Sequence, residues 1–441
     1  MTQRTITQES NMRKANIYMT IVFLVASNLF GLISAEGIFS LLFSSNMLLF
    51  ALCGIGAVAA LMSRKNGGLK VFGSYFGNYF GLFLFSVTFV ALLTLIEFPL
   101  ADRFRVFARW GSLLTLFFVF PALAYCKRAP RGIVDLMVVF ERAASVGCSL
   151  YILNALFFQA TGSLFLPGQS FLGDFEHASV RYFLVRLSVP AIFDFTTIFS
   201  FVMLLTTSGS EKRVHIFAFA VGVCAIVLVA QSRAEIAAIA ISIFVALVLR
   251  FGHEHPYLCL ISAGILALIL LAITGLFSNI LGLFMVNGNL ERSTMIRSDS
   301  TDYYLSVFTQ NPLIGFGFIV GSPSYYSLEH GISGLAWTSD VGFVGQLAQW
   351  GVFFLVLFVL SCARAIYVTL TCWRRSRIRL KCLMAAFLCY LAVTSYSLII
   401  LSVVGGLCFP LFVVIYESIA VECKDFSCSD ASWGVDYLEL H

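Results

Sequence analysis

The sequence predicts an all-α polytopic membrane protein, and three observations lead to that prediction. Hydrophobic residues make up 59% of the 441 residues, charged residues only 12%, and the mean hydropathy is +0.92. A soluble domain is about 45–50% apolar and about 25% charged, so this much apolar surface could not be hidden inside a soluble globule. The apolar residues form long runs instead of alternating with polar ones, which favours helices over a transmembrane β-barrel. A cytosolic enzyme, a disordered protein and a disulfide-rich secreted module are thereby excluded.

The apolar runs predict about 12 transmembrane helices. A helix needs about 20 apolar residues to cross the ~30 Å hydrocarbon layer. The runs lie at residues 17–35, 46–62, 72–96, 110–126, 134–158, 187–207, 215–230, 235–250, 257–277, 341–362, 383–402 and 404–421. Runs seven and eight are short and close together, as are eleven and twelve, so ten or eleven spans is the alternative. The first run reads as an uncleaved anchor, and residues 1–441 form a single integral membrane domain.

The distribution of Lys and Arg predicts that both termini are cytoplasmic, because cytoplasmic loops carry the excess of positive charge. With this topology the segment 422–441 is a cytoplasmic tail, and all Lys residues lie inside. The basic residues left outside are all Arg: Arg103, Arg105, Arg109, Arg181, Arg186, Arg233, Arg292 and Arg297. Orientation rules alone can deplete Lys outside. The other interpretation is an outer surface that binds phosphate, for which the planar, bidentate guanidinium is suited.

Two outer segments are too long to be simple connectors, namely a periplasmic loop at 159–186 and a large periplasmic loop at 278–340 between helices 9 and 10. Long loops in compact proteins are usually functional or disordered, and the second is rich in aromatic residues. Residues 300–310 suit a short amphipathic helix. Asn311 and Pro312 should end it, and Gly315-Phe316-Gly317 should form a tight turn. We therefore predict an ordered lid on the outer membrane face.

Charged residues close to the hydrocarbon point to function. Gln231-Ser232-Arg233-Ala234-Glu235 joins two apolar runs on the outer side, and such charges usually face a cavity or a partner. The alternative is an interfacial ion pair that caps two helix ends. Asp194 lies inside the sixth run, where it is a functional candidate by default or simply balances Arg186.

Three patterns then occur in a fixed order. Ser232-Arg233-Ala234 forms an SRG-like turn, Arg297 precedes Pro312 in the pattern R-(x)14-P-L-x-G-x-G, and Asp340 lies eleven positions before Gly351. In these features the sequence resembles the superfamily of O-antigen ligases and Wzy-type O-antigen or exopolysaccharide polymerases. The resemblance covers about residues 231–351, and the other spans match in hydropathy only.

The resemblance implies a metal-independent glycosyltransferase of GT-C-like architecture, without cofactor or nucleotide sugar, in the bacterial inner membrane. Its donor and acceptor would be undecaprenyl-pyrophosphate-linked glycans at the periplasmic face. Its partners would be membrane lipids, a chain-length regulator and a flippase, and no nucleic acid. The family glycine after the SRG-type arginine is Ala234 here. Ligases usually have His-Asn where this chain has Asp340-Val341, and Ser-Asp at this place is more typical of polymerases, so the resemblance favours a polymerase.

The resemblance places Arg233 and Arg297 on family arginines and Arg186 on a third. We expect Arg297, Arg233 and Asp340 to be catalytic, the arginines as clamps on the leaving pyrophosphate and Asp340 as a base. Asp340 also suits an ordinary helix cap. We expect these residues to bind substrate: Arg186, Arg181, Glu235, Arg292, His330 and Trp337.

Several of these residues have a simpler interpretation. Glu235 suits the orientation of Arg233 better than proton transfer. A lone loop histidine such as His330 is usually solvated, and Trp337 is suited to interfacial belting as well as to sugar stacking. The competing function is a transporter or flippase of an anionic glycolipid, which the position of the charges at the outer rim and the absence of an internal repeat disfavour.

Overall fold

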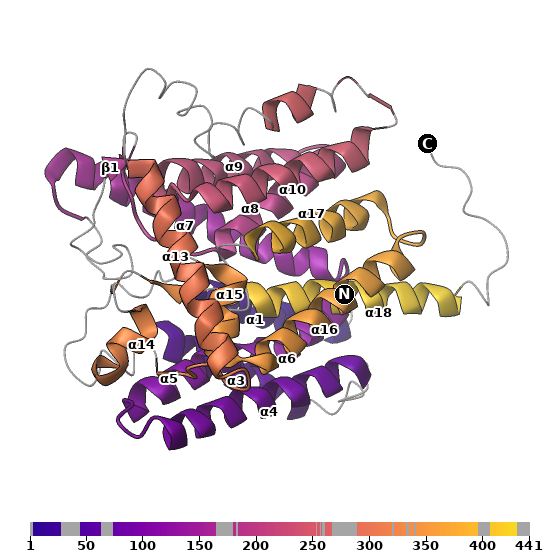
Figure 1. Ribbon diagram of the computed structural model, residues 1–441. Coiled ribbons are helices and arrows are strands. Elements are labelled where there is room, and N and C mark those ends of the chain that lie inside the picture. The colour runs from indigo at the N-terminus through magenta and orange to yellow at the C-terminus, as the bar shows by residue number, and fades with distance from the viewer. Residues whose placement is uncertain are drawn as a thin grey trace.

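The computed structural model describes residues 3–27, 45–62, 74–164, 180–181, 184–252, 254–255, 257, 261–266, 289–319, 322–331, 334, 336–338, 341–395 and 406–429. This part of the chain is almost entirely helical, and most helices lie side by side in a bundle (Figure 1). The helices of the first half are α1 (Gln3–Ala26), α3 (Ser45–Met62), α4 (Ser74–Glu97), α5 (Arg103–Leu113), η4 (Leu114–Phe118), α6 (Val119–Arg128) and α7 (Ile133–Thr161). A two-residue antiparallel pair follows, β1 (Val180–Arg181) and β2 (Leu184–Val185). The remaining helices are α8 (Ile192–Thr206), α9 (Glu211–Cys224), η6 (Ala225–Ala230), α10 (Arg233–Phe251), α13 (Asn289–Gln310), η7 (Pro323–Tyr325), α14 (Tyr326–His330), α15 (Gly342–Trp350), α16 (Val352–Cys372), α17 (Ile378–Thr394) and α18 (Cys408–Ser429).

Six of the described helices are long and apolar enough to cross a membrane. They span residues 75–97, 103–128, 133–161, 211–230, 233–251 and 352–372, and two shorter apolar helices lie at 47–62 and 192–206. An all-α, multi-pass membrane protein is therefore confirmed. Each predicted run overlaps described helical residues, although most of the run at 257–277 lies outside the described residues and only 257 and 261–266 are described as helical. The count of about twelve spans and the inside placement of both termini stay predictions.

The boundaries differ from the predicted runs in informative places. The run at 341–362 is two helices, α15 and α16, because Gly351 interrupts it with a φ of +62°. The run at 110–126 begins earlier, at Arg103, because the Asp102 carboxylate accepts hydrogen bonds from the backbone N–H groups of Phe104 and Arg105. At the C-terminus, α18 continues to Ser429 into the segment predicted as a tail, and residues 430–441 lie outside the described residues.

The centre of the bundle is α8, which packs against α7, α9, α10 and α17. Its residues from Ile192 to Met203 are all buried, including the polar ones. A helix that is apolar on all sides belongs in a core, not at a surface. On α9, Gly222 lets the backbone approach closely, since a Cβ there would overlap the Thr197 hydroxyl. Helix α8 thus holds α9 and α10 in fixed positions.

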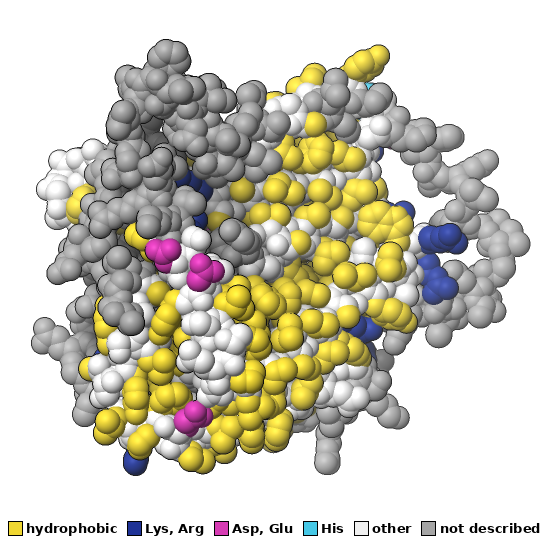
Figure 2. Space-filling model, in the orientation of Figure 1, with side chains coloured by type: hydrophobic (Ala, Val, Ile, Leu, Met, Phe, Trp, Pro, Cys, Tyr) yellow, Lys and Arg dark blue, Asp and Glu magenta, His cyan; other side chains and the backbone are white. Residues whose placement is uncertain are grey.

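Helix α13 runs across the ends of the bundle helices instead of along them, and packs on α15 (Figure 1). The predicted helix at 300–310 is confirmed at its end, Gln310, but it begins earlier, at Asn289. Figure 2 shows hydrophobic side chains over the broad middle of the described surface on this side, with Lys and Arg toward the ends of the helices. This distribution suits a bundle whose middle faces lipid.

Candidate functional site

The turn between η6 and α10 has an unusual backbone. Gln231 has a φ of +53°, and no other non-glycine residue in the described part of the chain has a positive φ. Its side-chain Nε2 donates to the carbonyl oxygens of Leu228 (2.8 Å) and Leu184 (2.9 Å). Strained backbone persists only when the surroundings hold it, and it concentrates at functional sites. The glutamine therefore does two things, since it closes the turn and ties that turn to β2.

This tie brings two predicted arginines together. Arg186 directly follows β2, and its Nε donates to the carbonyl oxygen of Ala230, 3.2 Å away, at the end of η6. Arg233 is the first residue of α10, three positions further on. Both residues are exposed. The fold thus presents two guanidinium groups from two segments that hydrogen bonds hold together at this turn.

Glu235 lies behind this pair, in the first turn of α10, and is 8% exposed. It interacts electrostatically with Arg186 and with the side chain of Ser232. Its charge partner is thus Arg186, where the sequence favoured Arg233. The carboxylate of Glu235 therefore supplies negative charge near the guanidinium of Arg186.

Asp194 is 1% exposed and lies deeper, in the first turn of α8. It accepts a hydrogen bond of 2.5 Å from the hydroxyl of Tyr390 on α17. The prediction that Asp194 simply balances Arg186 is wrong, because its hydrogen-bond partner is a tyrosine and the charged group acting on it is Glu235. Buried polar groups in a membrane protein have to be paired, and Tyr390 supplies the pairing.

The remaining predicted charges are two arginines on α13, one arginine on β1 and Asp340. Arg297 is exposed in the middle of this helix. Arg292 is on the same helix and Arg181 on β1, but their side chains lie outside the described part of the structure. Asp340 also lies outside the described residues, two positions before α15 begins. The catalytic role of Asp340 and the binding roles of Arg181 and Arg292 stay predictions.

The predicted tight turn after α13 is confirmed, and its glycines have a structural reason. Gly315 and Gly317 have φ values of +60° and +64°. A Cβ on Gly315 would overlap the carbonyl oxygen of Ala348, and one on Gly317 would overlap the hydroxyl of Thr94. Only glycine fits such close backbone approaches. The motif glycines are therefore packing residues.

Hydrogen bonds from backbone groups of this segment join it to three helices, α4, α15 and α16. Phe316 N–H donates to Ala348 C=O on α15 (2.9 Å), and Val352 N–H donates to Pro312 C=O (2.8 Å) across the Gly351 break. Phe318 N–H donates to the hydroxyl of Thr94 on α4 (3.0 Å). The sequence spacing of Pro312, Gly315, Gly317 and Gly351 thus reflects the contacts by which the large loop docks onto the bundle.

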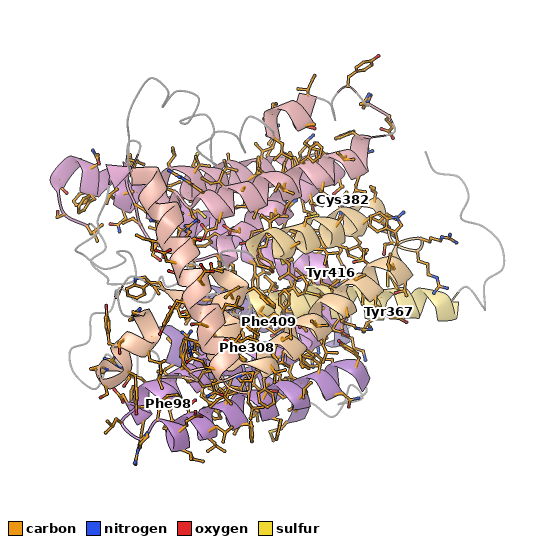
Figure 3. All side chains as sticks on the ribbon, in the orientation of Figure 1. Phe98, Phe308, Tyr367, Cys382, Phe409 and Tyr416 are labelled. Carbon is orange, nitrogen blue, oxygen red and sulfur yellow. The ribbon has the colours of Figure 1, made fainter. Side chains whose placement is uncertain are left out.

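Helix α14 is held by α13. The hydroxyls of Tyr303 and Tyr304 donate to the carbonyl oxygens of Leu328 and Glu329, both at 2.7 Å. Burial raises the pKa of Tyr303 above the usual range of a tyrosine. Nearby, the ring of Phe98, labelled in Figure 3, packs edge-on against Tyr325, with 5.2 Å between ring centroids.

His330 and Trp337 form an aromatic group at this end of the loop. The His330 ring centroid lies 4.2 Å from that of Trp337 and 4.5 Å from that of Tyr326. His330 is 4% exposed and its Nδ1 lies 2.9 Å from the carbonyl oxygen of Ala336, so the expectation of a solvated histidine is wrong. Trp337 is 44% exposed. His330 thus packs against Trp337, whose indole remains accessible for stacking on a ligand.

A second polar cluster involves residues that the sequence did not single out as a site. Arg109 on α5 donates from Nη2 to the Oε1 of Gln349 on α15 (3.1 Å), and its charge faces Glu329 on α14. Within the described residues, Arg109 Nε, Gln349 Nε2 and Gln346 Oε1 are buried without a hydrogen-bond partner. Arg109 was one of the outer arginines, and two glutamines stand in the apolar run at 341–362. Only the fold shows that these positions meet.

Arg109→Ala should destabilise the docked large loop. The change removes the hydrogen bond to the fully buried Gln349 and the charge opposite Glu329, and an unsatisfied buried group costs about 1–3 kcal/mol. We expect a lower apparent melting temperature in detergent and faster proteolysis near α14. Arg105→Ala is the matched control, since Arg105 is on the same helix and pairs with Asp102 at 3.3 Å with half its side chain exposed. Equal effects of the two changes would contradict this role.

One comparison with known proteins found a match. Residues 197–359 match a family model described as O-antigen ligase. The chain carries an O-antigen ligase domain. This domain runs from α8 into α16 and contains Arg233, Glu235, Arg297, His330 and Trp337, whereas Arg186 and Arg109 precede it. A search of the curated proteins found no match. The protein is thus a multi-pass membrane protein in which residues 197–359 are similar to the O-antigen ligase family, and this similarity supports a ligase- or polymerase-type function in glycan assembly.

Proposed function

We propose that this protein polymerises undecaprenyl-pyrophosphate-linked oligosaccharide repeat units at the periplasmic face of the bacterial inner membrane. The observation that carries the proposal is the set of exposed arginines at one end of the bundle. Arg186 and Arg233 are fixed on one turn, and Arg297 is presented by α13, which crosses the helix ends. With the predicted topology this end is periplasmic, where lipid-linked glycans are assembled.

The reaction needs charge stabilisation more than covalent chemistry. A hydroxyl of the acceptor glycan attacks the anomeric carbon of the donor, a new glycosidic C–O bond forms, and the bond to the pyrophosphate breaks. Negative charge grows on the departing undecaprenyl pyrophosphate, and preorganised cations at that point are the main means of lowering the barrier. Arg233, Arg297 and Arg186 hold this pyrophosphate in the proposal, and Glu235 supplies negative charge near Arg186.

The proton of the acceptor hydroxyl needs a receiver. We assign it to Asp340, which lies two positions before α15 in the sequence. General-base catalysis of this kind contributes about 10²–10⁴-fold. Trp337 would stack on a sugar ring through its exposed indole. Arg181 and Arg292 add positive charge on β1 and α13, where the glycan carriers approach.

The second candidate is a ligase that transfers finished glycan to lipid A core. It uses the same lipid-linked donor and the same leaving group, so the arginines support it equally. The sequence Asp340-Val341, where ligases usually have His-Asn, favours the polymerase. A transporter or flippase is the third candidate, and the location of the arginines at the end of the bundle disfavours it.

Deletion of the gene in its native host, followed by gel analysis of surface glycan, tests the proposal. We expect the long-chain ladder to collapse to a single attached repeat unit, or high-mass exopolysaccharide to disappear, and the wild-type gene to restore it. Long polymer that stays on its lipid carrier, with none on lipid A core, would replace the polymerase by the ligase. An unchanged glycan profile would contradict both and favour the transporter.

A further inference from the structure

An apolar groove lies between α9, η6 and α10 and is closed on its third side by residues 261–266. Its volume is about 280 Å³, and every residue that lines it is apolar except Ser262. Val227 and Ile265 at its margin are 37% and 53% exposed. The groove therefore opens on the outer surface of the bundle, where lipid surrounds the protein.

The sequence builds this groove from one stripe on each helix. On α10 the lining residues include Ile236, Ala240, Ile243 and Leu247, which recur at the three- and four-residue spacing of a single helix face. On α9 the lining residues are Phe219 and Val223, which are four positions apart and so lie on one face. Helix α9 packs chiefly on α8, whereas α10 packs chiefly on α17 and less on α8, so the two helices are held apart instead of against each other.

The position of the groove relative to the arginines indicates which kind of ligand it could bind. Arg233 begins α10, and Ile236, the first lining residue of that helix, follows three positions later on the same helix. The π-helical η6 contributes Ile226 and Val227 and ends one residue before Gln231, at the same turn. One end of the groove is therefore next to the arginine pair, while the other end extends into the apolar middle of the bundle.

We propose that this groove binds the polyprenyl chain of the lipid carrier, with the pyrophosphate held by Arg233 and Arg186. The inference rests on the proposed function and adds the site of the carrier's tail. A ligand with an anionic head and a single long apolar chain matches the charge at one end and the apolar walls along the rest. From Ile236 to Leu247 the groove extends about 16 Å at 1.5 Å per residue, roughly half of the hydrocarbon thickness. The first isoprene units would be seated in it, and the remainder of the chain would lie in the bilayer.

A bilayer offers the chain an equally apolar surrounding, so binding depends on close packing against the walls and not on the hydrophobic effect. Steric filling of the groove is therefore the sharpest test of the site. Val223→Trp on α9 and Ala240→Trp on α10 place an indole in the groove. Val248→Trp is the matched control, since Val248 is exposed on α10 and does not line the groove.

The direct experiment uses the full-length protein in nanodiscs of phosphatidylethanolamine and phosphatidylglycerol. Benzoylphenylalanine is placed at Ile243 or at Val248, undecaprenyl pyrophosphate is added, and adducts are identified by mass spectrometry after irradiation. We expect a polyprenyl adduct at position 243 and none at 248. Val223→Trp should reduce that adduct, and Arg233→Ala should weaken its formation at low ligand concentration. Adducts with phospholipid alone at position 243, or equal polyprenyl adducts at both positions, would overturn the proposal.

The filled groove should also slow glycan assembly. In cells we expect Val223→Trp and Ala240→Trp to lower polymer yield at least about tenfold, and Val248→Trp to leave it unchanged, at equal protein levels in the membrane. Wild-type yield from both filled variants would contradict the inference. The glycan profile could prove independent of the protein even though a polyprenyl adduct forms at position 243. That result would support the groove as a polyprenyl-binding site and contradict the polymerase function. These outcomes separate the two proposals.

Discussion

Replacement of Arg297 by Lys should lower the rate of polymerisation by about 10²–10³-fold, the loss typical of one removed transition-state contact. The substitution keeps the positive charge but removes the planar fork that binds two pyrophosphate oxygens at once. Arg233→Lys should have a similar effect, because Arg233 is exposed at the fixed turn next to Arg186. A simple point charge that steers the anion would tolerate Lys at both positions.

The measurement is the rate at which high-mass glycan forms in membranes that contain each variant at equal level. Arg213→Lys serves as the control, since Arg213 is exposed in the first turn of α9, at the end predicted to be cytoplasmic. We expect the control to match the wild type. Wild-type rates for Arg297→Lys and Arg233→Lys together would reject the bidentate clamp.

Gly315→Ala should have the largest effect on stability. The left-handed backbone costs a non-glycine residue about 1–2 kcal/mol, and the added methyl group would overlap the backbone of Ala348. Overpacking of this kind costs about 1–3 kcal/mol more. Because this turn docks the large loop on α4 and α15, the variant should lose both folded yield and activity.

Gly162→Ala separates the cost of the left-handed backbone from the cost of steric overlap. Gly162 has a φ of +72°, but nothing lies within 4 Å of the position its Cβ would take. This control should lose only the backbone part, about 1–2 kcal/mol. The apparent melting temperature in detergent and the rate of proteolysis within residues 311–319 report the difference. If the two variants lose equal stability, the close approach of Gly315 to α15 is not what holds the loop.

Hydropathy was sufficient to predict the fold class and most helix positions. It misses features that depend on single residues, such as the break at Gly351, which divides one apolar run into α15 and α16. It also misses α13 before residue 300, since a helix that lies across the bundle ends has no reason to be apolar. The hydropathy pattern of a segment predicts its structure only where the environment of the segment is uniform, as it is in lipid.

The candidate site could be predicted only in part. Arg186 and Arg233 share a turn because Gln231 ties β2 to η6, and no spacing rule contains that contact. Arg109 and Gln349 are 240 positions apart and meet only through tertiary packing. The glycines of the large loop were recognised by spacing, but their role in packing became apparent only from the neighbouring atoms.

The hydrogen bond from Phe318 to Thr94 also has a consequence for biogenesis. The two residues are 224 positions apart. At synthesis rates of about 5–20 residues per second, α4 is made roughly 11–45 s before the loop segment that hydrogen-bonds to it. During that interval the Thr94 hydroxyl has only its own helix to bond to, at the carbonyl of Val90. The loop also needs α15, which emerges from the ribosome later still, so its docking belongs to the last stage of assembly of the described bundle.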